Sequence, residues 1–389
     1  MRIVLIILTI VTFYSCSGQM KNIETGADQT GKYIPMLEGK KIAIVANQTS
    51  MVKNTHLVDT LLSMSKGGST FSIRKVFAPE HGFRGTIDDG VTVHDEVDTR
   101  TGLPIVSLYG RNKKPTATLL RDIDVVVFDI QDVGARFYTF ISTMHYVMEA
   151  CAEQDIPVII LDRPNPNGNY IDGPILEEAF SSFVGMHPIP VVHGLTIGEL
   201  AMMINGEGWL KGAITCDLTV IPCRNYTHES TYPLPVKPSP NLPNDHTIKI
   251  YPSTCFFEGT VISEGRGTPY PFEVYGHPDL KGSFSFVPES IPGMEMHPKF
   301  KGITCYGEDL RNYVPANGWT RLEIKWVLDA YEKFPDKAHF FRPFFDLLAG
   351  TDAFREQIVA GWSEAKIRDS WKPGLAAYRQ LRKNYLLYP

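Results

Sequence analysis

Three short apolar segments in the first half of the sequence are each followed at once by charged and amide residues. The polar strings are PEHGFRG (79–85), DIQDVGARFYT (129–139) and DRPNPNG (162–168). In open α/β sheets, ligands bind beyond the carboxyl ends of the strands, so side chains that follow several parallel strands meet at one edge. The sequence therefore predicts a polar active site at that edge.

Glu80 is the strongest candidate for acid–base chemistry. It follows a β-branched segment and Pro79, so its carboxyl group is expected to be partly desolvated, which suits a general acid near neutral pH. His81 could orient Glu80, bind substrate or satisfy a turn. The competing interpretation is a surface glutamate that caps the next turn.

The other charged residues in these strings allow two interpretations. Asp129, Asp132 and Asp162 could form a carboxylate cluster that holds sugar hydroxyls or a metal ion. Alternatively, they cap helices or pair with neighbouring arginines. Three arginines could together recognise a substrate carboxylate through fork-shaped hydrogen bonding; they are Arg84, Arg136 and Arg163.

The second half of the sequence adds a glycine-rich string with two glutamates, FFEGTVISEGRGT (256–268). Glu258, Glu264 and Arg266 within it could approach a ligand closely, because glycine lets the backbone come near. The alternative is a β-hairpin in which the glycines make the turn. Asn241, in a proline-rich segment, is expected to be held rigidly between two domains.

Two alternating periodicities predict the fold of the first half. Short β-branched runs indicate buried parallel strands at 41–46, 73–77, 105–108, 124–129 and 157–162. Helical spacing of apolar residues separates them, above all in 136–154, and Thr196 with Glu199 forms a capping-box pattern for a helix over 196–205. Alternation of this kind predicts an α/β fold with a Rossmann-like, doubly wound parallel sheet.

The alternation of strand-like and helical patterns ends near residue 222, and the composition changes there. The stretch 232–245 is rich in proline and is expected to be irregular. Aromatic, glycine- and proline-rich stretches follow, and then three helical patterns at 321–331, 351–362 and 375–386. We expect an N-terminal catalytic domain over 34–230 and a smaller α+β C-terminal domain over 231–389 that completes the cleft.

The first residues have the features of an export signal. Arg2 precedes an uncharged apolar run, residues 3–15, that ends at Cys16. This run is shorter than the ~20 residues of a spanning helix and fits the apolar region of a signal peptide. Because Cys16 follows a small residue, we expect a lipoprotein signal peptide over 1–16, a lipid anchor at Cys16 and a polar tether over 17–33. The protein would then be exported, and anchored in the periplasm or outer membrane of a Gram-negative bacterium.

Composition and missing motifs argue against several classes of partner. A net charge of -5 gives no reason to expect nucleic acid. Neither GxGxxG nor GxxxxGK[ST] is present, so a nucleotide cofactor has no support. The sequence has no compact spacing of metal ligands either, and we expect no cofactor. One disulfide among the cysteines beyond Cys16 would be compatible with export.

Six strings in order resemble one family. They are PEHGFRG (79–85), DIQDVGARFYTF (129–140), DRPNPNG (162–168), HGLTIGELA (193–201), PSPNLP (238–243) and FEGTVISEGRGT (257–268). Together they resemble the family typified by NamZ, an exo-β-N-acetylmuramidase that was formerly a domain of unknown function. The resemblance extends from about residue 34 to the C-terminus. It implies two domains and the release of N-acetylmuramic acid from non-reducing ends of peptidoglycan fragments.

The resemblance also implies roles for individual residues. Glu80 matches the catalytic glutamate of the family and would act as general acid and base. Its partner would be Asp132, Glu258 or Glu264, with the 2-acetamido group of the substrate as another nucleophile. A clamp for the lactyl carboxylate would come from Arg84, Arg136, Arg163 or Arg266. Further residues of these strings are candidates for substrate binding: His81, Asp129, Tyr138, Asp162, Asn165, His193, Asn241 and Glu258.

Two other functions stay open on the sequence. One is a sugar-binding lipoprotein that captures muropeptides without turnover. The other is a metal-dependent hydrolase that uses His81 with Asp129, Asp132 and Asp162.

Overall fold

A seven-stranded sheet forms the first half of the molecule. The computed structural model describes residues 22–80, 82–84, 96–110 and 112–389. The strands, in spatial order, are β11 (Leu218–Ile221), β8 (Val158–Leu161), β7 (Val125–Asp129), β1 (Lys41–Ala46), β4 (Ser72–Ala78), β6 (Pro104–Ser107) and β5 (Glu96–Val97). All neighbours are parallel except β5 and β6. Apart from β5, this is the order of Rossmann folds, and the predicted fold class is confirmed.

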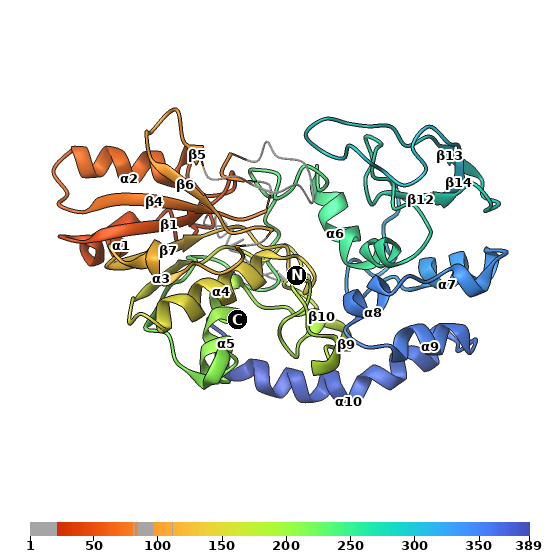
Figure 1. The fold of residues 1–389 in the computed structure, drawn as a ribbon. Coiled ribbons are helices and arrows are strands. Elements are labelled where there is room, and N and C mark those ends of the chain that lie inside the picture. Colours follow the sequence, from red (N-terminus) through yellow and green to blue (C-terminus); the bar gives the residue numbers. More distant parts are fainter. Residues whose placement is uncertain (1–21, 81, 85–95, 111) are drawn as a thin grey trace, which may run out of the picture.

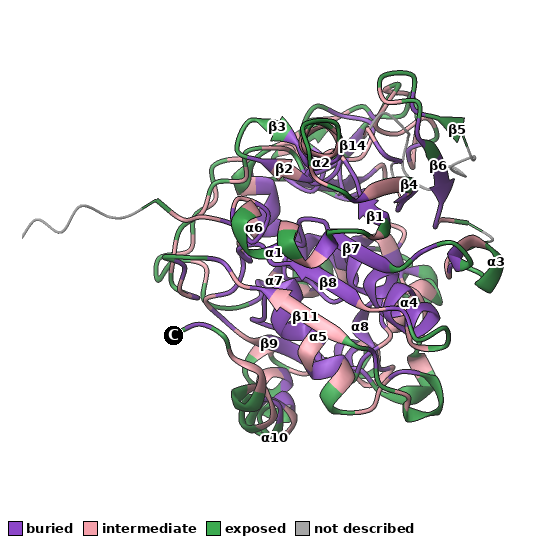
Figure 2. Ribbon diagram, turned by 90° about the vertical axis from the view of Figure 1, so that its left-hand side faces the viewer, coloured by how far each residue is buried: buried purple, intermediate pink, exposed green. Residues whose placement is uncertain are grey.

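Side chains alternate along each strand, so both faces of the sheet carry apolar residues, and helices cover each face. In β1, Ile42 and Ile44 face one apolar core, whereas Ala43 and Val45 face the other. The first core is closed by α1 (Thr30–Leu37) and α2 (Leu57–Lys66), and the second by α4 (Phe140–Ala152) and α5 (Ile197–Gly206). The central strands β8, β7 and β1 are accordingly buried (Figure 2), whereas the edge strands β11 and β5 are more exposed. The order of strands reverses direction beside β1, which puts a crevice at the carboxyl ends of β4, β1 and β7.

Smaller elements connect these layers. They are the hairpin of β2 (Met51–Val52) and β3 (Thr55–His56), the pair β9 (Asp172–Ile175) and β10 (Pro190–Val192), the helix α3 (Ala117–Leu120), and the short 3-10 turns η1 (Glu178–Phe180) and η2 (Lys211–Ala213).

Two expected helix starts had different outcomes. The capping box at Thr196 and Glu199 is confirmed, with both reciprocal hydrogen bonds present. The helix expected from Arg136 instead begins at Phe140. The backbone before Phe140 pairs with β10 and does not form a helix: Ala135 forms a bridge with Val192, and the amide of Arg136 donates to the carbonyl of Val191 at 2.7 Å.

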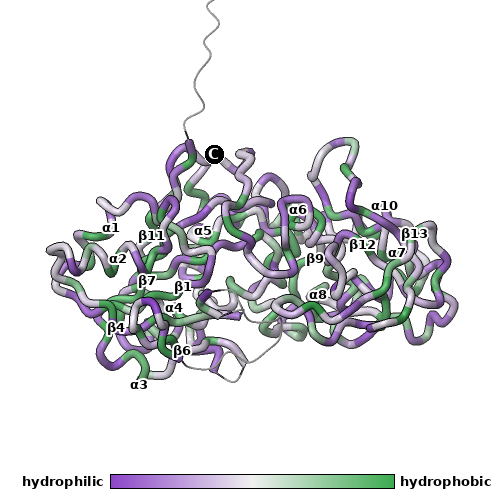
Figure 3. The backbone as a smooth tube through the Cα atoms, turned by 90° about the horizontal axis from the view of Figure 1, so that it is seen from above, coloured by the Kyte–Doolittle hydropathy of each residue, from purple (hydrophilic) through white to green (hydrophobic). Residues whose placement is uncertain are grey.

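The second half is a smaller α+β assembly, which lies beside the sheet in an elongated molecule (Figures 1 and 3). Its strands β12 (Val274–His277), β14 (Cys305–Asp309) and β13 (Phe284–Phe286) form an antiparallel sheet. Its other elements are α6 (Asp245–Thr254), η3 (Cys255–Gly259), α7 (Lys325–Lys333), η4 (Lys337–His339), α8 (Phe344–Ala349), α9 (Ala353–Val359), α10 (Glu364–Arg382) and η5 (Lys383–Tyr385).

The last helix returns to the first half of the molecule. α10 runs along the lower side of both halves (Figure 1), and the hydroxyl of Tyr378 donates to the carbonyl of His193 at 2.8 Å. We expected a helix over 375–386, but α10 begins at Glu364 and continues through Pro373. Proline disfavours a helix interior. Here the packing of α10 against β9 outweighs that local penalty, and Gly374 lies directly against Ile175.

The expected tether over 17–33 was too long. Residues 22–33 belong to the fold: Ala27 is fully buried and α1 begins at Thr30. Gly26 lies so close to the backbone of Ile221 and Asp162 that a Cβ atom would clash with both. The polar composition of this stretch concealed buried side chains that bind the fold through hydrogen bonds, such as Gln29, whose Nε2 donates to the carbonyls of Thr25 and Pro222.

The five cysteines of the described residues are buried and free, so no disulfide joins them. Within the same residues, no helix is long and apolar enough to cross a membrane.

Arg136 ties the two halves together. Its guanidinium is fully buried and donates to the carbonyls of Pro174, Ile189, Leu348 and Ala349 at 2.6–2.9 Å. Burial lowers the pKa of Arg136 to about 9, so the group stays protonated at neutral pH and keeps its donors. The carbonyls come from β9, from the residue before β10 and from the end of α8, so one side chain fixes three segments.

Arg136→Met should destabilise the fold by at least about 3 kcal/mol, because several buried carbonyls lose their donor at once. Urea-induced unfolding would measure the loss. Arg121→Met removes an exposed arginine and should change stability by less than about 0.5 kcal/mol. Equal unfolding midpoints for the two variants would contradict this role of Arg136.

Candidate active site

A cavity of about 370 Å³ lies where the two halves meet, at the carboxyl edge of the large sheet. It contains five of the residues that the sequence singled out: Glu80, Tyr138, Asn241, Glu258 and Arg266. We call it the Glu80 cavity. The first two residues come from loops after β4 and β7, and the others from the second half of the chain. Of the three loops that the sequence predicts at this edge, those after β4 and β7 contribute to the cavity lining, whereas the loop after β8 does not.

Glu80 is set by the turn that follows β4. The end of β4 is fully buried, and the amide of Gly82 donates to the carbonyl of Pro79 at 3.1 Å to close the turn. Gly82 has a φ of 75°, which glycine adopts without strain. The next residue, Phe83, is buried and anchors the turn. The half-buried Glu80 side chain is thus directed into the cavity.

Thr139 fixes the carboxyl group of Glu80. Its hydroxyl donates to Oε2 of Glu80 at 2.9 Å, and Thr139 is the residue directly before α4. The amino end of a helix favours negative charge. The hydrogen bond and the helix end therefore orient one carboxyl oxygen and leave the other for a ligand.

Glu258 is the second carboxylate in the lining of the cavity. Its Oε1 accepts hydrogen bonds from Nη2 and Nε of Arg266, at 2.6 and 3.2 Å. Glu264 is buried behind this pair, where Lys299 donates to it at 2.9 Å. Glu258 lies in η3 and Glu264 in the irregular segment that follows it, so the alternative hairpin is not found.

Asn241 offers a buried acceptor. Its Nδ2 donates to the carbonyl of Met294 at 3.1 Å, while its Oδ1 has no hydrogen-bond partner among the described residues. Tyr138 donates to the carbonyl of Pro238 at 2.8 Å and so holds the proline-rich segment against the first half. An unsatisfied buried acceptor costs about 1–3 kcal/mol, and a ligand N–H or O–H would satisfy it.

The other residues of the lining were not named as site residues from the sequence, although Phe137, Thr139 and Phe140 lie within the string 129–140. They add a cation and two hydroxyl groups, Lys113, Thr139 and Ser239, and a set of aromatic rings, namely Tyr109, Phe137, Phe140, Phe183, Tyr251, Phe272 and Phe344. These residues come from segments far apart in the sequence, and single aromatics or lysines carry no local signal. Aromatic faces with a few polar groups are typical of sites that bind sugars or similar small molecules.

Several predicted residues instead hold the loops in place. Asp129 and Arg163 form a buried ion pair, with two hydrogen bonds at 2.6 and 2.8 Å. Burial alone would lower the pKa of Arg163, but the carboxylate of Asp129 outweighs it and raises that pKa. Asn165 donates to the carbonyl of Leu195 at 2.8 Å. None of these predicted side chains lines the Glu80 cavity.

Asp162 and Asp132 are also buried in the scaffold. Asp162 accepts hydrogen bonds from the hydroxyl of Thr196 at 2.7 Å and from the hydroxyl of Tyr388, and burial raises the pKa of Asp162 to about 6. Asp132 accepts from the amide of Gly134 at 2.7 Å, with His193 at 3.5 Å from the same oxygen. The structure does not bring Asp132, Asp162 or His193 to the cavity lining.

Two of the remaining predicted arginines lie elsewhere too. Arg84 forms ion pairs with Asp98 at 2.8 Å and Asp59 at 3.6 Å. The guanidinium of Arg136 donates its hydrogen bonds to backbone carbonyls and not to the cavity. His81 and Cys16 lie outside the described residues. No group of three or more potential metal ligands occurs among the residues that the structure describes, which gives no support to the alternative of a metal-dependent hydrolase.

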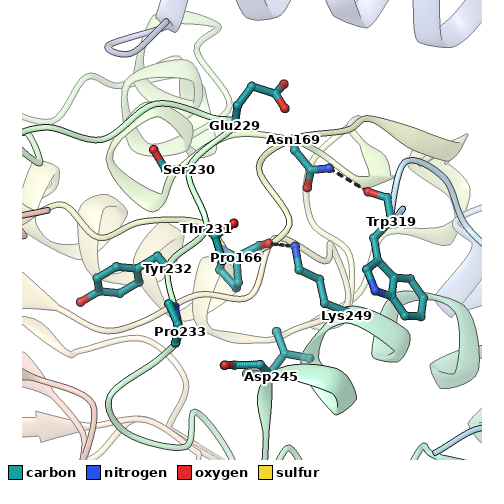
Figure 4. A pocket seen from close by; sticks show the side chains of 11 residues that line it. Pro166, Asn169, Glu229, Ser230, Thr231, Tyr232, Pro233, Asp245, Lys249 and Trp319 are labelled. Carbon is teal, nitrogen blue, oxygen red and sulfur yellow. Dashed lines mark hydrogen bonds between the residues drawn. The ribbon is translucent and has the colours of Figure 1, made fainter. Parts of the chain in front are cut away.

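A separate cavity of about 270 Å³ adjoins the amino-terminal part of α6. There Lys249 donates to the carbonyl of Pro166, and Asn169 donates to the carbonyl of Trp319 at 2.7 Å (Figure 4). None of the residues expected to act on a substrate lines it. The Glu80 cavity is therefore the candidate active site.

Comparison with known proteins agrees with this architecture. A family model for the N-terminal domain of the exo-β-N-acetylmuramidase NamZ matches residues 42–246, and the model for its C-terminal domain matches residues 249–388. The peptidoglycan β-N-acetylmuramidase NamZ of Bacillus subtilis strain 168 is 38% identical, over 97% of this chain and 96% of that protein.

Two solved structures have the same fold. Both are DUF1343 family proteins from Bacteroides fragilis NCTC 9343. One is 47% identical with a TM-score of 0.86, over 95% of this chain and 99% of that chain. The other is 29% identical with a TM-score of 0.82, over 94% of this chain and 99% of that chain.

His56 supports the turn that carries Glu80. Its ring meets the ring of Phe83 edge-on, with centroids 5.0 Å apart. Nε2 contacts the carbonyl of Asn47 at 2.8 Å, and Nδ1 accepts from the amide of Val58 at 3.2 Å. This arrangement requires a neutral ring. Burial lowers the pKa of His56 from its ordinary value of 6.5 to about 4.

Acidification should therefore weaken the fold around Glu80. Because the pKa of His56 is lower in the folded state, its contribution is complete above about pH 6.5 and is lost as the pH falls towards 4, with a limit of about 3 kcal/mol. Urea-induced unfolding at pH 7.5 and 4.5 would measure this loss. His56→Gln keeps a donor and an acceptor without a titrating ring, so its stability should fall less between the two pH values. An identical fall in both proteins would contradict the role of His56.

Proposed function

Because this chain belongs to the NamZ exo-β-N-acetylmuramidase family, we propose that it is a glycoside hydrolase that releases N-acetylmuramic acid from the non-reducing ends of peptidoglycan fragments. The observation that carries the proposal is the Glu80 cavity, which has two carboxylates, a buried amide and aromatic rings in its lining. Its position between two halves of the chain suits an enclosed terminal sugar.

Glu80 acts as the general acid in this proposal. It gives its proton to the glycosidic oxygen while the bond from that oxygen to the anomeric carbon breaks. A water molecule supplies the hydroxyl group for the anomeric carbon, and the proton of that water restores the acid. The hydrogen bond from Thr139 to Oε2, at 2.9 Å, supports this role because it orients the carboxyl group.

Glu258 is the best-supported partner carboxylate. Of the three candidates from the sequence, only Glu258 contributes to the cavity lining, whereas Asp132 and Glu264 are buried in other contacts. Arg266 holds one oxygen of Glu258. In the proposal, Glu258 stabilises the positive charge that develops at the anomeric centre or activates the attacking group.

Asn241 and the aromatic residues bind the sugar. The unpaired Oδ1 of Asn241 would accept a hydrogen bond from the acetamido N–H or a hydroxyl group. Half-buried rings in the lining, such as Tyr109 and Phe344, would pack against the apolar faces of the sugar ring. The proposal requires no metal ion or nucleotide.

Glu80→Gln should lower kcat by about 100- to 10,000-fold, because an amide cannot donate the proton. Two substrates sharpen the test: a disaccharide of N-acetylmuramic acid and N-acetylglucosamine, and 4-nitrophenyl β-N-acetylmuramide. Nitrophenolate leaves without protonation, so an acid role predicts a larger loss with the disaccharide. Equal losses would indicate a different role for Glu80, and near-normal turnover of both would reject the assignment.

Glu332→Gln is the matched control, because Glu332 is an exposed glutamate on α7. It should retain normal kcat, and circular dichroism should be unchanged in both variants. If the unaltered protein binds the nitrophenyl substrate without releasing nitrophenol, the chain is a capture protein for muropeptides and not an enzyme.

Export and lipid anchoring form a second part of the proposal. Residues 1–16 would direct export, and Cys16 would carry the lipid after cleavage. The apolar run that ends at Cys16 supports this. The protein would then act on wall fragments outside the cytoplasm, from the periplasm or the outer membrane.

Cys16→Ala should abolish incorporation of labelled palmitate and leave the uncleaved precursor, because the thiol is the acceptor of the lipid. Ser17→Ala, a change of the adjacent residue, should be labelled and processed normally. Labelling of the Cys16→Ala variant at the normal level would contradict the proposed anchor.

A further inference from the structure

Recognition of N-acetylmuramic acid requires a partner for its lactyl carboxylate, and this question rests on the proposed function. A carboxylate moved from water into a cavity needs a cation that is not already neutralised. Two cations line the Glu80 cavity, Lys113 and Arg266. Arg266 already faces Glu258 at 2.6 Å and Glu264 at 3.4 Å, so its charge is balanced by the protein.

Lys113 is in a different position. Its Nζ lies 4.2 Å from the centroid of the Phe183 ring, and no ion pair joins Lys113 to a carboxylate of the described residues. An aromatic face attracts an ammonium group without cancelling its charge. The half-buried Lys113 thus keeps its positive charge and its hydrogen-bond donors for a ligand.

Neighbouring contacts hold this cation at the cavity. The adjacent Lys114 is anchored on α4 by Glu149 at 2.6 Å and Glu153 at 2.7 Å. On the other side, the carbonyl of Phe183 accepts a hydrogen bond from Ser142 of α4 at 2.7 Å. Lys113, through its neighbour Lys114, and Phe183 are therefore both held against α4. The residue directly before α4, Thr139, contacts Glu80.

We propose that Lys113, supported by Phe183, is the specificity-determining residue that binds the substrate carboxylate. The four arginines expected to do this have other partners: Asp98 for Arg84, backbone carbonyls for Arg136, Asp129 for Arg163 and Glu258 for Arg266. Lysine presents a compact charge with three donors, which suits a carboxylate whose orientation is set by the rest of the sugar. Sugars without that charge would gain nothing from Lys113.

The test compares an acid with its uncharged ester. The full-length protein, solubilised in detergent, is assayed with 4-nitrophenyl β-N-acetylmuramide and with the methyl ester of its lactyl group. Lys113→Met should raise KM for the acid by about 10- to 100-fold, as expected for a lost hydrogen bond to a charged group. It should leave kcat and the KM for the ester nearly unchanged. Lys113→Arg should recover part of the preference for the acid.

Lys281→Met serves as the control, because Lys281 is an exposed lysine of the second half, and it should behave like the unaltered protein. Calorimetric binding of free N-acetylmuramic acid and of its methyl ester tests Lys113 without turnover. Loss of the acid preference in binding supports the inference even if no substrate is hydrolysed, in which case only the proposed function fails. An unchanged preference in Lys113→Met, or equal weakening for acid and ester, overturns it.

Discussion

The cost of removing charged and polar groups from water governs the arrangement of this molecule. A buried charge is tolerated only when its hydrogen-bonding capacity is almost fully used. Arg136 meets this condition with four backbone carbonyls. Arg163 is neutralised by both oxygens of Asp129 and also donates to the carbonyl of Met51. Because these partners come from distant segments, satisfying each charge fixes how the loops at the sheet edge and the second half of the chain are placed.

The cavity is a consequence of this scaffold. Asn167 donates to the carbonyls of Val133 and Ile248, so the loop after β8 holds both the loop after β7 and the helix α6. Tyr138 in turn holds the proline-rich segment. With the walls fixed by buried contacts, the groups that face the cavity can keep spare hydrogen-bonding capacity, as the Oδ1 of Asn241 does. Such prepared groups bind a ligand without reorganisation.

Because some polar residues support the loops and others line the cavity, a polar motif alone does not show which of its residues contact a ligand. The string DRPNPNG supplies Asp162, Arg163 and Asn165, which all serve as buried supports. The string PEHGFRG supplies one residue that lines the cavity, Glu80, and one buried support, Phe83, which anchors the turn. Loss of a support would displace the cavity walls and reduce activity much as loss of a contacting residue would. Measurements of stability alongside activity are therefore needed to separate the two.

The sequence by itself determined the α/β class, most strands of the sheet, the capping box at Thr196 and the strand edge at which polar loops meet, because these depend on local periodicity and on the rules of parallel sheets. It also singled out Glu80, two residues beyond the end of β4, which the structure places in the lining of the cavity. Only the tertiary structure decided which polar residues are partnered in the interior and which face the cavity. Residues such as Lys113 and Phe183 could not be found in advance, since their role depends on contacts between segments far apart in the chain. The same holds for α10, where long-range packing overrides the local effect of Pro373.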